Sequence, residues 1–152
     1  MRSMSNSLAS RLVTTGRAMF APDGQFDAVG LGPFSIQPGG DLSGDLEVVT
    51  AACEPGPRKA IAHEVAKLMV RTKARVQGEG EAKLLAETMV DDLSRYPLDV
   101  VRFACAYWIE GGREARFFPS WPELKSICDR RMDGRLRLRR ALEWAVTEGS
   151  DA

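Results

Sequence analysis

The stretch from Pro97 to Glu110 constrains the fold more than any other part of the chain. Between these two residues the only charged side chains are Asp99 and Arg102. A helix that is apolar on most of its surface belongs in the centre of a fold, and proline is well tolerated where a helix begins. We therefore predict a central helix here. The predicted core around it consists of Tyr96, Val100, Phe103, Tyr107, Trp108, Phe118, Trp121 and Leu124.

Two further helices are expected before this central one. Ile61, Val65 and Leu68 share one face of a helix that starts after Pro57. Glycines at 78 and 80 separate it from a second helix over about 81–95. The pattern predicts an all-α fold, in which a small bundle of four to five helices with short antiparallel connections spans 58–149.

Residues 1–57 read as a flexible N-terminal region. Glycine and proline supply 13 of the 42 residues from 16 to 57, a fraction typical of irregular chain. Within it, Leu46, Val48 and Val49 suggest one short strand or a fold-back contact. A short helix at 4–15 is also expected, because Met4, Leu8 and Leu12 recur at helical spacing. That helix is either a frayed terminus or a partner-docking helix that orders on contact.

The composition excludes several classes of function. The chain has no net charge, 21 bases against 21 acids, although residues 1–57 carry three arginines and six acids. Three widely spaced cysteines and a single histidine argue against a zinc site. No GxxxxGK[ST] phosphate loop occurs, and catalytic machinery has few candidates. We expect no enzyme, cofactor or metal. We also expect no membrane span and a cytoplasmic location, since long apolar runs are absent.

The segment 125–140 is strongly basic, with seven bases and two acids. On one uninterrupted helix, Arg131 and Arg135 would fall in the middle of the apolar face. Two solutions are open. The arginines pair inward, with Asp92 as a candidate partner, or the helix breaks at Asp133 and Gly134, which form a turn signal. We favour the break.

The same segment offers a candidate binding surface. Arg137, Arg140 and Trp144 project together from the side opposite Leu138. Guanidinium groups beside an exposed indole suit phosphate contact and base stacking. They suit an interface hot spot equally well, and a solvated basic face is the plain alternative. The predicted nucleic-acid or partner-binding residues are Arg130, Arg137, Arg140 and Trp144, with Arg113 and Arg116 from the loop 111–119.

Residues 94–128 carry a resemblance to a known family. The matching positions are Tyr96, Pro97, Val100, Val101, Trp108, Phe118, Pro119, Glu123 and Leu124. In this pattern a Tyr-led helix, a basic loop, a Phe-Pro-x-x-x-(Glu/Asp)-Leu/Ile element and a closing helix follow one another. Ser120 and Glu123 also fit a capping box, which marks a helix start. The stretch resembles small phage proteins that load or inhibit the replicative helicase.

The resemblance implies a non-enzymatic phage or prophage replication accessory protein whose partner is a replicative helicase of a bacterial host. In those proteins the flexible helicase-binding segment follows the helical domain, whereas the long Gly/Pro-rich stretch of this chain precedes it. Two alternatives remain open. One is a nucleic-acid-binding module that uses the basic segment 125–140. The other is a phage inhibitory protein that binds a different host protein.

Overall fold

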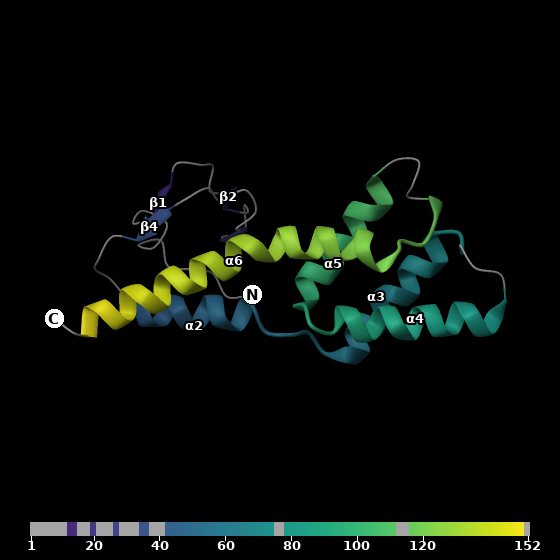
Figure 1. The fold of residues 1–152 in the computed structure, drawn as a ribbon, viewed down its shortest axis with the longest axis horizontal. Helices are drawn as coiled ribbons and strands as arrows, with labels where there is room; N and C mark the ends of the chain where they lie inside the picture. The colour runs from purple at the N-terminus through teal and green to yellow at the C-terminus, as the bar shows by residue number, and fades with distance from the viewer. Residues whose placement is uncertain are drawn as a thin grey trace. The chain divides into compact units, whose positions relative to one another are not determined.

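The fold of the described residues is all-α, as the sequence predicts (Figure 1). The computed structural model describes residues 12–14, 19–20, 26–27, 34–36, 42–74, 78–111 and 116–150, with side chains for 42–74, 78–111 and 116–147. The helices are α2 (Leu42–Ala52), α3 (Arg58–Arg71), α4 (Glu79–Leu93), α5 (Leu98–Glu110) and α6 (Trp121–Ser150). In this described part of the chain, every helix is too short or too polar to cross a lipid bilayer.

Four very short strands precede the helices. β1 (Leu12–Thr14) pairs antiparallel with β4 (Phe34–Ile36), with Val13 opposite Ser35. β2 (Met19–Phe20) pairs antiparallel with β3 (Phe26–Asp27). The expected helix over 4–15 does not reach its predicted end, because Leu12 begins β1. Met4 and Leu8 lie outside the described residues.

The chain divides into two compact units. The first unit contains residues 1–53 and 130–152, and the second contains residues 54–129. Helix α6 begins in the second unit and continues into the first. The sequence suggests a boundary at residue 57 instead, with all of 58–149 in one domain. The C-terminal part of α6 thus groups with residues from the N-terminal third of the chain.

Helix α2 occupies part of the region predicted to be irregular. Leu42, Leu46 and Val49 recur at spacings of four and three, which places them on one helical face, and Val49 is buried. The predicted short strand at 46–49 is therefore wrong. The β-branched valines favour a strand only weakly, and burial decides such cases. Helix α2 lies alongside the C-terminal half of α6 (Figure 1), where Arg135 Nη1 donates to the Ala52 carbonyl at 2.7 Å.

The second unit packs α3, α4 and α5 with the start of α6. Its buried side chains include Ile61, Val65 and Leu68 of α3, Met89 and Leu93 of α4, Val100, Val101 and Trp108 of α5, and Leu124 of α6. Pro57 and Pro97 immediately precede α3 and α5, and each carbonyl accepts a first-turn hydrogen bond at 3.1 Å. Gly56 lies against Leu98, and its N–H donates to the Tyr96 carbonyl at 2.9 Å.

Hydrogen bonds hold the described residues 116–120 of the connection between α5 and α6. Lys73 and Phe117 form a parallel bridge in which Phe118 N donates to the Lys73 carbonyl at 2.9 Å. Trp108 Nε1 donates to the Phe117 carbonyl at 2.8 Å. At the start of α6, the predicted capping interaction is present, since Ser120 N donates to Glu123 Oε2 at 2.7 Å.

Most of the predicted core is buried, with one clear exception. Tyr96, Val100, Trp108, Phe118 and Leu124 are buried, and Phe103 and Trp121 are half-buried. Tyr107 is 51% exposed, so its assignment to the core is wrong. Helix α5 is apolar on more sides than its neighbours cover, and the sequence alone does not show which apolar side remains outside.

Candidate macromolecule-binding surface on helix α6

Helix α6 runs without interruption from Trp121 to Ser150, so the break favoured at Asp133 and Gly134 is wrong. Glycine inside a helix costs about 1 kcal/mol relative to alanine. That cost is small beside the burial of Met132, Leu138 and Leu142, which lie on both sides of Gly134. A glycine therefore marks a helix end only where no packing holds the helix on its far side.

The first of the two predicted solutions, inward pairing, accounts for Arg135. This residue is only 3% exposed and points inward, and its guanidinium donates to the Ala52 carbonyl near the end of α2. The carbonyls of the last turn of a helix lack intrahelical partners, so a cation there is favourable. Asp92, the partner suggested by the sequence, pairs with Arg95 at 3.9 Å instead.

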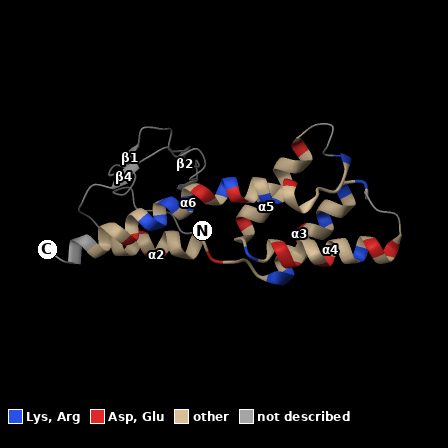
Figure 2. Cartoon of the chain, viewed as in Figure 1, with Lys and Arg blue, Asp and Glu red and all other residues tan. Residues whose placement is uncertain are grey.

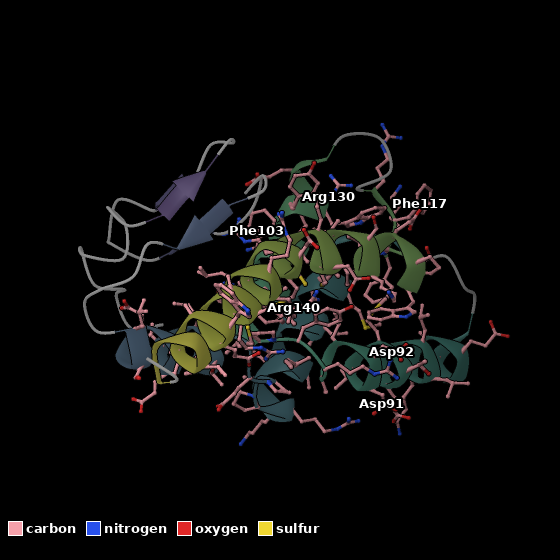
Figure 3. All side chains as sticks on the ribbon, turned by 60° about the vertical axis from the view of Figure 1, so that its left-hand side comes forward. Asp91, Asp92, Phe103, Phe117, Arg130 and Arg140 are labelled. Carbon is pink, nitrogen blue, oxygen red and sulfur yellow. The ribbon has the colours of Figure 1, made fainter. Side chains whose placement is uncertain are left out.

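Continuity of α6 places the predicted binding residues on one face. Arg130, Arg137, Arg140 and Trp144 are separated by seven, three and four residues, which is the repeat of a single helical stripe. We call these four residues the basic stripe; all of them belong to the first unit. Figure 2 shows Lys and Arg recurring along the middle of α6, and Figure 3 labels Arg130 and Arg140 on it.

Two arginines of the basic stripe have no ion-pair partner in the described part of the chain. Arg130 and Arg140 are exposed, and neither forms an ion pair with any of the residues whose side chains are described. Arg137 differs, because its side chain is 34% exposed and lies 3.1 Å from Asp133. Trp144 is 66% exposed, an unusual position for an indole in a folded domain. The stripe therefore presents two guanidinium groups and one aromatic ring to solvent.

The two loop arginines are placed differently. Arg113 lies outside the described residues. Arg116 is exposed in the second unit, where its carbonyl accepts a hydrogen bond from Lys73 N. Arg116 is therefore not part of the basic stripe. Its backbone contributes to the connection that leads into α6.

The sequence does not predict a second surface feature, which lies on α5. The rings of Phe103 and Tyr107 stack with their centroids 5.8 Å apart and an interplanar angle of 29°. Figure 3 labels Phe103 on this helix. Both residues were assigned to the core because their neighbours in sequence are apolar. The spacing of four residues is the only sequence signal that they act as a pair.

A half-buried hydrogen bond from the Tyr96 hydroxyl connects the turn before α5 with α6 in the second unit. Tyr96 donates its hydroxyl to Asp129 Oδ1, and Lys125 also bonds this carboxylate. Burial acts to raise the pKa of Asp129, but the hydrogen bonds from Lys125 and Tyr96 outweigh it and lower the pKa. Burial and the bond to Asp129 raise the pKa of Tyr96. The pair links the start of α5 to α6 across 33 residues.

A buried carboxylate between α3 and α5 was also missed. Glu64 is 6% exposed and lies 2.9 Å from Lys67 Nζ and 3.2 Å from Arg102 Nε. Burial acts to raise the pKa of Glu64, but these two cations more than compensate and lower it. Only the spacing of Glu64 and Lys67 is visible in the sequence. Over the ranges that the structure describes, no three His, Cys, Asp or Glu side chains gather closely enough to hold a metal ion.

No protein-family model matches this chain, and neither a curated protein nor a solved structure matches it.

Proposed function

We propose that this protein is a non-enzymatic replication accessory protein of phage type, which acts in the cytoplasm of a bacterial host by binding the replicative helicase and loading or inhibiting it. The observation that carries the proposal is the packing of the residues that resemble such proteins. Tyr96, Trp108, Phe118 and Leu124 are all buried in the second unit. The hydroxyl of Tyr96 bonds Asp129 of α6, and Glu123 caps the start of that helix at Ser120.

The stacked pair of Phe103 and Tyr107 supports a protein-binding role. Tyrosine and other aromatic side chains dominate binding energy at protein interfaces, where they bury a large area at a small entropic cost. Tyr107 of this pair is exposed on α5 and Phe103 is half-buried beside it, so the stacking holds the tyrosine ring in place for contact. We therefore assign the helicase contact to this side of α5.

The direct test uses the full chain and the purified replicative helicase of the bacterial host. Binding is measured by size-exclusion chromatography and interferometry, and the ATPase and unwinding rates of the helicase are followed in parallel. We expect complex formation and a change in at least one rate. Replacement of Tyr107 by alanine should weaken binding about tenfold or more, as for interface hot spots. Leu84→Ala is the matched control, since it removes an exposed apolar side chain from α4 of the same unit.

Two results would remove this proposal. The first is the absence of a complex together with unchanged ATPase and unwinding rates. The second is the capture of a different host protein from lysate, identified by mass spectrometry and abolished by Tyr107→Ala, which would favour an inhibitor of another host pathway.

A second candidate function, nucleic-acid binding, is favoured by the basic stripe. Exposed, unpaired arginines suit phosphate contact, and an exposed indole suits base stacking. The two guanidinium groups of Arg130 and Arg140 lie on the same face as Trp144. Since phosphate contacts release counterions, binding by this surface should weaken steeply as salt increases.

This candidate is tested by fluorescence anisotropy with labelled single- and double-stranded DNA at low salt. The double variant Arg130→Glu, Arg140→Glu should weaken binding and reduce the salt slope by about two. The matched control is Lys59→Glu, Lys83→Glu, which makes the same change in net charge on exposed positions of the second unit. Equal loss in both variants would show that only net charge matters, and binding unchanged in the stripe variant would exclude the stripe.

A further inference from the structure

A small groove lies between α3 and α5 in the second unit. It encloses about 250 Å³, and its apolar lining includes Leu68, Cys105 and Ile109. This volume is below the roughly 300–1,000 Å³ of pockets that hold cofactors or drug-sized ligands. The groove is therefore of a size for one or two side chains of a longer ligand that continues over the surface.

The charges around this groove favour an anionic group. Three cations, Lys67, Arg71 and Arg102, line it together with a single carboxylate, Glu64. Glu64 forms an ion pair with Lys67 at 2.9 Å and another with Arg102 at 3.2 Å, so both of these cations already have a partner. Arg71 is exposed and has no ion-pair partner in the described part of the chain. The excess of positive charge thus rests on a guanidinium that is free to bind a carboxylate in bidentate geometry.

We propose that the groove between α3 and α5 docks a peptide segment of a partner protein that presents an acidic side chain next to an apolar one. The apolar side chain would contact the lining at Ala106 and Ile109, and the acidic one would pair with Arg71. The ligand is selected by the apolar lining together with Arg71, whose guanidinium has no ion-pair partner in the described part of the chain.

Nucleic acid fits this groove less well than a peptide does. The lining contains no aromatic ring on which a base could stack. The apolar lining also offers no hydrogen-bond partners to a phosphate backbone, which would lose its hydration there. The groove rests on the proposed protein-binding function and would supply a second contact of defined chemistry. Its test does not use the helicase, so the groove and the proposed function can fail separately.

The test measures binding of a fluorescein-labelled peptide, Glu-Leu-Asp-Phe-Asp-Leu-Glu, to the full chain by fluorescence anisotropy. The matched probe carries lysine in place of each acidic residue. We expect saturable binding of the acidic probe only. In two-dimensional NMR spectra, the perturbed amides should cluster on α3 and α5 along the groove. Binding of both probes, or perturbations confined to other helices, would overturn the proposal.

Two variants and one control locate the binding site. Arg71→Glu reverses the unengaged charge, and Ala106→Glu places a carboxylate at an exposed position of the groove lining. Each should weaken acidic-probe binding by about tenfold or more, as expected for loss of a charge-assisted contact. Lys59→Glu changes an exposed base elsewhere on α3 and should leave binding within about twofold of wild type, since exposed charges away from a contact have little effect. Displacement of the labelled peptide by unlabelled DNA at equal affinity, or equal effects of all three variants, would overturn the peptide assignment.

Discussion

The burial of Trp108 gives a prediction whose magnitude follows from the structure. The side chain is 9% exposed, and its Nε1 donates to the Phe117 carbonyl at 2.8 Å. Burying about nine-tenths of an aromatic surface on the order of 200 Å², at about 25 cal/mol per Å², contributes roughly 4–5 kcal/mol. Trp108→Ala should therefore lower the free energy of unfolding by about 4 kcal/mol, within the range for large aromatic truncations.

The neighbouring residue Tyr107 supplies a control on the same helix. It is 51% exposed, so the same calculation gives about 2.5 kcal/mol for Tyr107→Ala. A third variant, Trp108→Phe, keeps most of the ring volume but leaves the Phe117 carbonyl without its indole donor. It should cost about 1–3 kcal/mol, the range for a lost hydrogen-bond partner.

The assay is urea unfolding followed by circular dichroism at 222 nm, with linear extrapolation to water. The expected order of destabilisation is Trp108→Ala, then Trp108→Phe and Tyr107→Ala at similar values. A loss below about 1 kcal/mol for Trp108→Ala, or one no larger than that of Tyr107→Ala, would refute the central position of this helix.

Three further predictions concern glycine packing, pH and thiol reactivity. A Cβ at Gly56 would lie 2.8 Å from Leu98 N, so Gly56→Ala should cost about 1–3 kcal/mol in urea unfolding, whereas Gly80→Ala meets no atom within 4 Å and should be neutral or stabilising. The lowered pKa of Asp129 stabilises the fold above the unfolded value of about 3.9, and this contribution is lost as pH falls through the folded pKa. Stability curves from pH 7 to 2 should thus fall less for Asp129→Asn, and parallel curves would contradict the linkage. Finally, Cys53 should react fastest with a thiol reagent at pH 8, because burial raises the pKa of Cys105 and of Cys128 to about 12. A fast phase of the thiol reaction that persists in Cys53→Ser would disprove this.

Part of the candidate site was predictable because its signals are local. The seven-, three- and four-residue spacings of the basic stripe follow from helical periodicity, and they hold wherever the helix is continuous. The position of Ser120 and Glu123 at the start of α6 is a signal of the same kind. What was not predictable was whether the helix continues past Gly134, since that depends on burial on both sides of it.

The remaining features depend on residues that are distant in sequence. Arg135 is accommodated by the end of α2, 83 residues earlier in the chain, and Glu64 is paired with Arg102, 38 residues later. The sequence by itself determined the helices of the second unit, their proline and serine starts and the residues of the basic stripe, because periodicity and capping act within a few residues. Only the tertiary structure decided that α6 is continuous, that Tyr107 faces outward and that the groove beside Arg71 exists. Each of these depends on which faces of the helices cover one another, and that is set by packing across the whole fold.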